Sequence, residues 1–132
     1  MKKHILLIDE DKHELKSFMQ IVNNCHGAFK CTYANTATQA LEMLRYLEID
    51  FIFINYHLTH INSLHLVSAI RYESKHENAG IYIYAGEMDN ETIKMARLLG
   101  ASGCIKRSAD LQSLVSRFNS ILSVRRKQSV NN

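Results

Sequence analysis

Five short apolar runs are spread along the chain, and each is followed by a segment whose apolar residues recur at helical spacing. A short, continuously apolar run is typical of a strand that is buried on both faces. The expected strands are His4–Ile8, Ala28–Tyr33, Phe51–Ile54, Ile81–Tyr84 and Gly103–Ile105. The expected helices are Asp11–Asn24, one capped by Thr36 that extends to Leu47, one capped by Asn62 or Ser63, one that begins at Asp89 or Asn90 and ends before Gly100, and Asp110–Arg126.

The regular alternation of strands and helices predicts an α/β fold with a five-stranded parallel sheet. Right-handed crossovers then place helices on both faces, which gives a doubly wound, three-layer α/β/α sandwich. In such a sheet, functional side chains gather beyond the carboxyl ends of the strands. The residues at those ends are Asp9 and Glu10, Asn55, Ala85 and Gly86, and Lys106 and Arg107.

The composition fits one ordinary domain. Of the 132 residues, 46% are apolar, which is enough for a core at this length, and no apolar run is long enough to predict a membrane span. The opening MKKHILLIDED begins like a signal peptide, but three acids interrupt its short apolar stretch. The three scattered cysteines indicate reduced thiols, so we expect a cytoplasmic protein.

The charge pattern gives little indication of a nucleic-acid partner. The net charge is +3, and the one basic run, Arg125 to Lys127, suits the end of the last helix. Binding of nucleic acid by this run is the less favoured interpretation. We expect a single domain over residues 1–127 and a disordered tail over residues 128–132.

Three segments carry a resemblance to a known family. They are LLIDED (6–11), DFIFINYHLTHINSLHLVSAIR (50–71) and IYIYAGEMDNETIKMARLLGASGCIKRSAD (81–110). In this order and at this spacing, they resemble the receiver domain of two-component response regulators over nearly the whole chain. The resemblance implies a flavodoxin-like (CheY-like) strand order and a role in phosphorelay signalling.

In that family, an Asp at the end of the third strand accepts a phosphoryl group from a histidine kinase, and acids after the first strand help to hold Mg²⁺. A Ser or Thr after the fourth strand and a Lys after the fifth contact the phosphoryl group, and an aromatic residue on the fifth strand rotates when the site is charged. Matched residue by residue, the acidic pair remains as Asp9 and Glu10. The acceptor position holds Asn55, the Ser/Thr position Ala85, the Lys position Arg107, directly after Lys106, and the aromatic position Cys104.

Asn55 decides the chemistry that this resemblance predicts. An amide cannot form an acyl phosphate, because the nucleophile must be a carboxylate oxygen. Ala85 and Cys104 also lack the hydroxyl and the aromatic ring that respond to phosphorylation in the family. We therefore expect a degenerate phosphorylation site and a pseudo-receiver, a protein that is not an enzyme, has no catalytic residue and works by binding other proteins.

The acidic pair allows two interpretations. With Asn55 neutral, one carboxylate ligand is missing, so we expect no cofactor, or only weak Mg²⁺ binding by Asp9 and Glu10. The favoured interpretation pairs Arg107 or Lys106 with one of these acids. By the same reasoning, Asn55→Asp should restore Mg²⁺ binding, because it adds a third carboxylate.

The family also uses a particular face for its partners, formed by the fourth helix, the fifth strand and the last helix. Here that face would consist of Ile93, Arg97, Cys104, Lys106 and Arg107. The implied partner is a protein such as a histidine kinase or a downstream signalling protein, and a homodimer through the same face is an alternative.

Other functions remain as competing interpretations. A residual Mg²⁺-dependent enzyme or a small-ligand binder would use the crevice at Asp9 and Glu10. The DxD form of an aspartate-nucleophile phosphatase is also present there, but no later acidic pair stands at a strand end. His57, His60 and His65 are interpreted as solvated histidines rather than as a metal site or a phospho-histidine relay.

Overall fold

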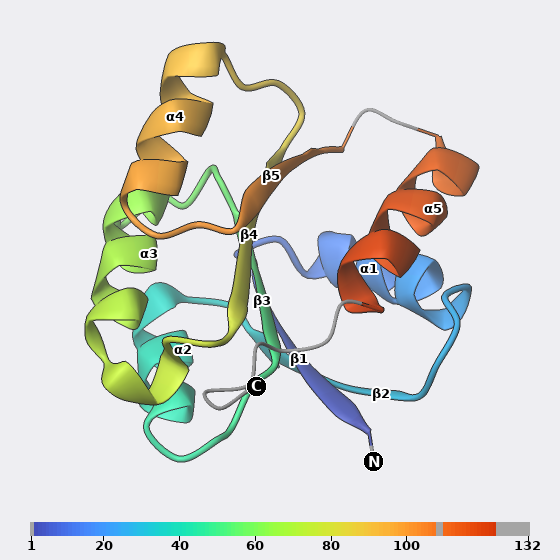
Figure 1. Ribbon diagram of the computed structural model, residues 1–132, viewed down its shortest axis with the longest axis horizontal. Helices are drawn as coiled ribbons and strands as arrows, with labels where there is room; N and C mark the ends of the chain where they lie inside the picture. The colour runs from blue at the N-terminus through green and yellow to red at the C-terminus, as the bar shows by residue number, and fades with distance from the viewer. Residues whose placement is uncertain (1, 108–109, 124–132) are drawn as a thin grey trace, which may run out of the picture.

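The computed structural model describes residues 2–107 and 110–123, in which strands and helices alternate along the chain (Figure 1). The elements are β1 (Lys3–Ile8), α1 (Lys12–Asn23), β2 (Phe29–Ala34), α2 (Ala37–Leu44), β3 (Phe51–Asn55), α3 (Ser63–Tyr72), the 3-10 turn η1 (Ser74–His76), β4 (Gly80–Ala85), α4 (Asn90–Leu98), β5 (Gly103–Lys106) and α5 (Leu111–Leu122). Within these residues, five parallel strands form one sheet in the order β2-β1-β3-β4-β5. The predicted doubly wound sheet with the flavodoxin-like order is confirmed.

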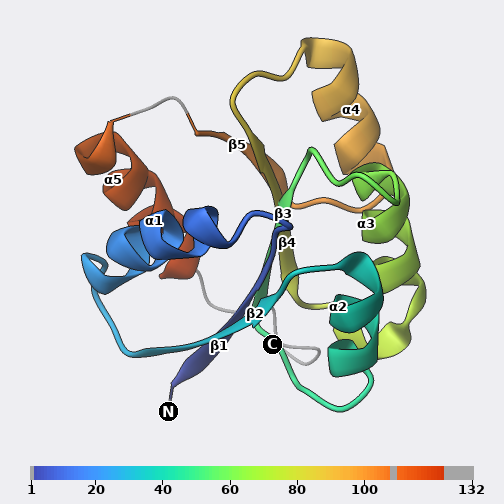
Figure 2. The ribbon, with the colours of Figure 1, turned by 180° about the vertical axis from the view of Figure 1, so that it is seen from behind.

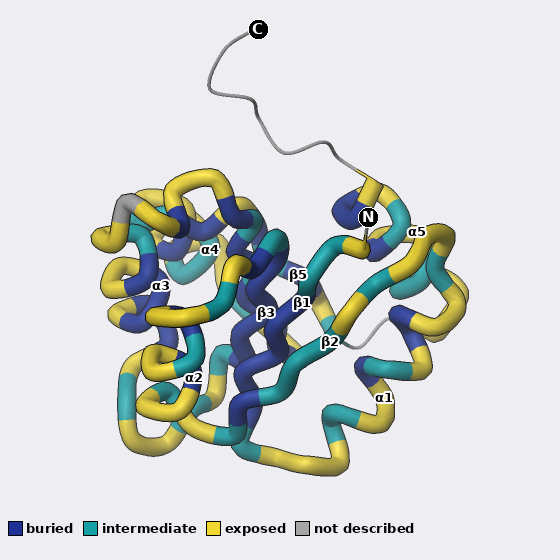
Figure 3. The backbone as a smooth tube through the Cα atoms, turned by 90° about the horizontal axis from the view of Figure 1, so that it is seen from below, coloured by how far each residue is buried: buried dark blue, intermediate teal, exposed yellow. Residues whose placement is uncertain are grey.

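Helices cover both faces of this sheet. α1 and α5 lie on one face, and α2, α3 and α4 lie on the other (Figures 1 and 2). Beneath α1 and α5 the core is aromatic, with Phe18, Phe53, Tyr84 and Phe118 in contact and the Phe53 and Phe118 ring centroids 5.0 Å apart. The opposite face is aliphatic. The central strands are therefore buried on both sides, as Figure 3 shows, which explains their continuously apolar sequences.

Side-chain caps fix where the helices begin. At each of five helix starts, an oxygen of the residue before the helix accepts a hydrogen bond from a backbone N–H in the first turn. The capping residues are Asp11, Thr36, Asn62, Asp89 and Asp110. This settles the two alternatives that the sequence left open, in favour of Asn62 and Asp89.

Several strand and helix ends differ from the prediction by a residue or more, and α2 and β3 are two examples. α2 ends at Leu44 and does not reach Leu47, because the N–H groups of Arg45 and Tyr46 bond to carbonyls three residues back and tighten the last turn. β3 extends one residue further than expected and includes Asn55, which pairs in register with Tyr84 of β4. The sheet itself therefore positions Asn55.

Some sequence predictions fall on residues that the structure does not describe. The predicted end of the last helix at Arg126, the basic run that precedes residue 128 and the tail at 128–132 all lie beyond residue 123. Within the described part of the chain, none of the helices has the length and apolar character that crossing a bilayer requires. Cys25, Cys31 and Cys104 are free thiols.

Gly100 is a position where the fold requires glycine. Its φ is +118°, and a Cβ added there would lie 2.5 Å from Cγ of Arg71, whose Nε donates to the Gly100 carbonyl at 2.8 Å. We expect Gly100→Ala to lower the free energy of unfolding by about 2 kcal/mol or more. The alanine would have to adopt the positive φ of Gly100, and its Cβ would overlap with Arg71. Urea unfolding measures the change.

Gly86→Ala is the matched control, because a Cβ at Gly86 would meet nothing within 4 Å and its φ is not positive. Its effect should stay within about 0.5 kcal/mol. Equal effects of the two substitutions would contradict the strain assigned to position 100.

Candidate functional site

The carboxyl ends of the strands bring most of the predicted site residues to one edge of the sheet. Asp9 and Glu10 follow β1, while Asn55 and Ala85 are the last residues of β3 and β4. β3 lies between β1 and β4 in the sheet, so Asn55 stands between the acids and Ala85. This edge is the natural place for a site in a doubly wound sheet.

Asp9 is the centre of this edge and is completely buried. Its backbone N–H donates to the Ala34 carbonyl at 3.1 Å, and its own carbonyl accepts from the Tyr33 hydroxyl at 2.6 Å. Its carboxylate accepts from the Asp11 N–H at Oδ1 (2.9 Å) and from the Tyr84 hydroxyl at Oδ2 (3.0 Å). A buried carboxylate is costly unless donors surround it, and Asp9 finds its donors within the protein.

Tyr84 reaches Asp9 from two strands away. Neighbouring strands lie about 4.8 Å apart, so its phenol has to extend across the end of β3 to meet a residue that follows β1. Burial, and then the nearby charge of Asp9, raise the pKa of Tyr84, so the hydroxyl stays protonated and donates a hydrogen bond to the carboxylate. The Arg107 guanidinium lies over the same ring, 5.4 Å from its centroid.

Glu10 and Asn55 are also engaged by protein donors. Both carboxylate oxygens of Glu10 accept from the Thr59 N–H, at 3.1 and 2.9 Å, which ties the loop after β3 to the end of β1. The side-chain oxygen of Asn55 accepts from the His57 N–H at 2.9 Å, and Asn55 is only 7% exposed. The amide therefore closes a local turn at the start of the same loop.

The predicted ion pair of Arg107 or Lys106 with Asp9 or Glu10 is wrong. Arg107 pairs instead with Glu14 of α1, with Nη2 and Oε2 3.0 Å apart and both side chains largely covered. Lys106 pairs with Glu87 at 3.2 Å, and both of these side chains are exposed. Tyr84, a neutral donor, takes the place beside Asp9 that the prediction assigned to a cation.

The arrangement does not fit a resident Mg²⁺ ion. Octahedral Mg²⁺ needs several oxygen ligands directed at one point. In the part of the chain that the structure describes, no three His, Cys, Asp or Glu side chains form such a group. Asp9 is covered, and both acids already accept hydrogen bonds from protein donors. This edge is held together by the protein's own groups.

The predicted partner face lies on the other side of Ala85. A cavity of about 120 Å³ between α4 and β5 is lined by Ala85, Glu87, Met88, Ile93, Cys104, Ile105 and Lys106. It brings together Ile93, Cys104 and Lys106, and Arg97 is close enough to influence the Cys104 thiol. Arg107 is turned away from this group toward α1. Burial raises the pKa of Cys104, which favours the neutral thiol of a small core residue.

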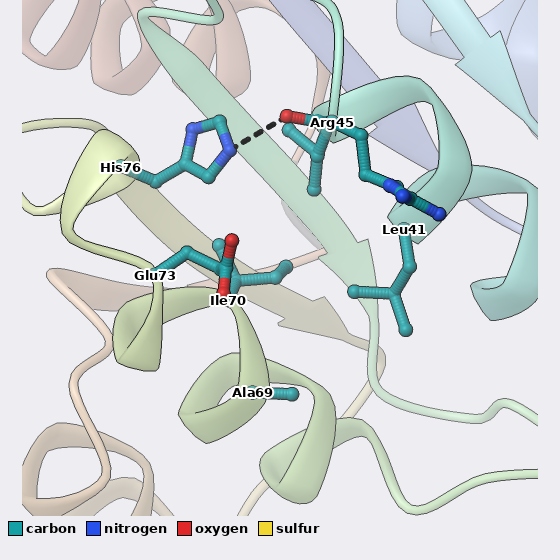
Figure 4. Close-up of a pocket in the computed structure, with 7 residues that line it drawn as sticks. Leu41, Arg45, Ala69, Ile70, Glu73 and His76 are labelled. Carbon is teal, nitrogen blue, oxygen red and sulfur yellow. Dashed lines mark hydrogen bonds between the residues drawn. The ribbon is translucent and has the colours of Figure 1, made fainter.

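Two further cavities have neither Asp9 nor Glu10 in their lining. One, of about 230 Å³, opens between α1 and α5 beside the Arg107–Glu14 pair, and its lining includes Phe18 and Tyr84. The other, of about 290 Å³, lies between α2 and α3 at the opposite edge of the sheet (Figure 4). There the buried His76 ring bonds through Nε2 to the Leu44 carbonyl at 2.9 Å, which satisfies the end of α2.

A sequence family matches most of the chain. The response regulator receiver domain covers residues 5–119. The chain belongs to this family. Receiver domains are modules of two-component signalling that work with histidine kinases and downstream proteins.

Solved receiver structures share the fold of this receiver domain. Chemotaxis response regulator CheY4 of Vibrio cholerae superposes with a TM-score of 0.81 at 15% identity, over 92% of this chain and 99% of that one. The receiver of a DNA-binding response regulator from Colwellia psychrerythraea 34H gives 0.82 at 16%, over 93% and 100%. That of an HD domain-containing protein from Pseudomonas fluorescens Pf-5 gives 0.79 at 23%, over 92% and 95%. No protein with a curated description matches the sequence.

Sequence reasoning missed two residues of this site. Tyr84 was predicted only as the end of the strand Ile81–Tyr84, although its place one residue before Ala85 puts it at the functional edge. Glu14 was not singled out. The available signal was position: Tyr84 is the penultimate residue of β4, and Glu14 lies in the first turn of the helix that follows the acids.

The hydrogen bonds between Glu10 and the Thr59 N–H should restrain the loop after β3. A hydrogen bond to a charged group contributes about 1.5–3 kcal/mol, so Glu10→Ala should speed hydrogen exchange at the Thr59 amide by about tenfold or more. Glu10→Gln, which keeps one acceptor, should retain most of the protection. NMR exchange rates measure both.

The Thr92 amide is an internal control, because it is held by Asp89 at 2.8 Å, in the cap of α4. Its exchange rate should be the same in all three proteins. An unchanged rate at Thr59 in Glu10→Ala would show that the contact does not restrain the loop.

Proposed function

We propose that this receiver domain signals without being phosphorylated at the end of β3, and that it acts by binding protein partners. The observation that carries the proposal is Asn55, a buried amide at the end of β3 whose oxygen already accepts the His57 N–H. The family resemblance assigns the phosphoacceptor to this position. An amide offers no carboxylate oxygen to attack a phosphoryl donor.

The neighbours of Asn55 support the same proposal. Ala85 is buried and has no hydroxyl that could donate to a phosphoryl oxygen. Arg107, which stands at the family's Lys position, is engaged with Glu14 and with the Tyr84 ring. The groups that would bind and read a phosphoryl group are therefore replaced or used elsewhere, and the pseudo-receiver interpretation accounts for all of these changes together.

For the partner surface we propose the face formed by α4, β5 and α5. Arg97 and Lys106 are exposed there, and Arg117 of α5 reaches β5, where its Nη2 donates to the Cys104 carbonyl at 3.3 Å. Three cations around the small cavity at Ile93 and Cys104 favour a partner with an acidic surface and an apolar side chain at its centre. A cytoplasmic signalling protein is the corresponding class of partner.

The alternative, an enzyme or small-ligand binder that uses the Asp9 and Glu10 crevice, has less support. Such a site needs accessible carboxylates with oxygens directed at a ligand. Asp9 is fully buried, and the oxygens of Glu10 are directed at the Thr59 N–H. No specific contact favours this second function.

The proposal predicts that small phosphodonors do not label the protein. Incubation with acetyl phosphate and Mg²⁺ should leave the intact mass unchanged, because Asn55 is not a nucleophile. A receiver with an Asp acceptor, treated in parallel, shows that the reagent is active. A stoichiometric phosphate adduct on the wild-type chain would sink the proposal.

It also predicts which surface substitutions abolish partner binding. Arg97→Glu with Lys106→Glu should remove a specific partner from a pull-down out of the native cell extract, because the charge of the face is reversed. Lys16→Glu on α1 is the matched control, an exposed charge reversal away from this face, and should retain the partner. Loss of binding in the control alone would assign the interface to α1.

A further inference from the structure

We infer that the hydroxyl of Tyr84 takes the place of a cation at Asp9 and closes the acidic site to divalent metal ions. The inference deepens the proposed function and rests on it, since a receiver that works without phosphorylation has no need of Mg²⁺ at its acidic edge. Tyr84, together with Asn55, then determines that the site excludes divalent metal ions.

A buried carboxylate requires hydrogen-bond donors or a metal ion. Asp9 is 0% exposed, so water cannot satisfy it, and each of its oxygens needs a donor or a metal ion. The Asp11 N–H serves Oδ1 and the Tyr84 hydroxyl serves Oδ2. A cation at Oδ2 would compete with the phenol for this oxygen, and displacing the phenol would lose the hydrogen bond and uncover the carboxylate.

Neighbouring side chains hold the phenol of Tyr84 in place. The Tyr84 ring stacks on Phe18 with centroids 6.4 Å apart, and the Arg107 guanidinium lies 5.4 Å from its centroid. Arg107 is in turn fixed by Glu14 at 3.0 Å. Contacts from α1 and from the end of β5 therefore hold the hydroxyl against Asp9, and they also place a positive charge close to the site.

These contacts change what Asn55→Asp should do. From the sequence, a third carboxylate should be enough to restore Mg²⁺ binding. In the structure, a carboxylate at position 55 would still stand beside a blocked Asp9. Asn55→Asp alone should therefore gain little Mg²⁺ affinity, whereas Asn55→Asp combined with a change at Tyr84 should gain it.

A simpler interpretation is that Tyr84 is only a core aromatic. Tyr82 tests this, since it lies on the same strand, two residues earlier and on the same face, and packs on Phe53 with ring centroids 5.6 Å apart. If packing alone matters, changes at the two tyrosines should have similar effects on metal binding. If the hydroxyl at Asp9 matters, only the changes at Tyr84 should have an effect.

The experiment compares Mg²⁺ binding across one set of variants. They are the wild type, Asn55→Asp, Asn55→Asp with Tyr84→Phe, Asn55→Asp with Tyr84→Val, and Asn55→Asp with Tyr82→Phe. Each is stripped with EDTA and titrated with Mg²⁺ alone, with the melting temperature and the calorimetric heat as readouts. In the wild type, NMR should detect a slowly exchanging Tyr84 hydroxyl proton.

We expect the melting temperature of the Tyr84 variants to lie below that of their Asn55→Asp parent by about 5 °C or more without metal, and to recover as Mg²⁺ binds. Their Mg²⁺ affinity should exceed that of Asn55→Asp by about tenfold or more, the size of effect that neighbours of metal ligands commonly have. The Tyr82 variant should match its Asn55→Asp parent. Phe removes only the hydroxyl, and Val also removes the ring, so affinity should rise in that order.

Two results would overturn the inference. One is an Asn55→Asp protein that binds Mg²⁺ as tightly as the double variants. The other is a folded double variant that gains no Mg²⁺ response. If Tyr84→Val fails to fold, the Tyr84→Phe variant, which keeps the packed ring, gives the same comparison. A phosphate adduct on the wild type would remove the proposed function and leave this metal comparison standing, so the two ideas fail separately.

Discussion

A carboxylate that is buried away from water needs hydrogen-bond donors from the protein, and Asp9 is such a carboxylate. The structure at the carboxyl ends of the strands supplies these donors. The backbone of Asp9 is hydrogen-bonded to Ala34 and Tyr33 of β2. Its side chain is hydrogen-bonded to Asp11, before α1, and to Tyr84 of β4. One residue thus joins three strands and a helix. Removing the Tyr84 hydroxyl would leave one oxygen of this buried carboxylate without its donor, and loss of a partner of a buried charged group is costly.

The fold could be predicted from the sequence because its determinants are local. Each buried strand is a continuous apolar run such as FIFI, and each helix has a capping residue before it, as Thr36 and Asp110 illustrate. The position of Asn55 at the functional edge followed from the same pattern, since the end of an apolar strand can be read without knowledge of its neighbours. The errors lie at the ends of elements, such as the last turn of α2 and the last residues of β3 and β4.

The hydrogen bonds and ion pairs of the site could not be predicted, because they join residues far apart in the chain. Alternation along β4 marks Tyr84 as facing the core, yet it says nothing about what the tip of a long phenol meets. That contact requires the strand order, which puts β3 between Tyr84 and Asp9. Similarly, Glu14 and Arg107 are 93 residues apart, and only the packing of α1 beside β5 makes them partners. A charge rule applied to the nearest acids therefore chose the wrong pair.

The tether between Glu10 and the Thr59 N–H has a consequence for how such a protein would carry information. It holds the loop after β3 against the end of β1 through hydrogen bonds within the protein, which need no added chemical group. Under the proposed function, a partner meets the same surface at all times, and the fraction of partner bound follows from mass action alone. Under this proposal, the signal is the number of copies of this protein in the cell. Synthesis and proteolysis, instead of kinases and phosphatases, then control it.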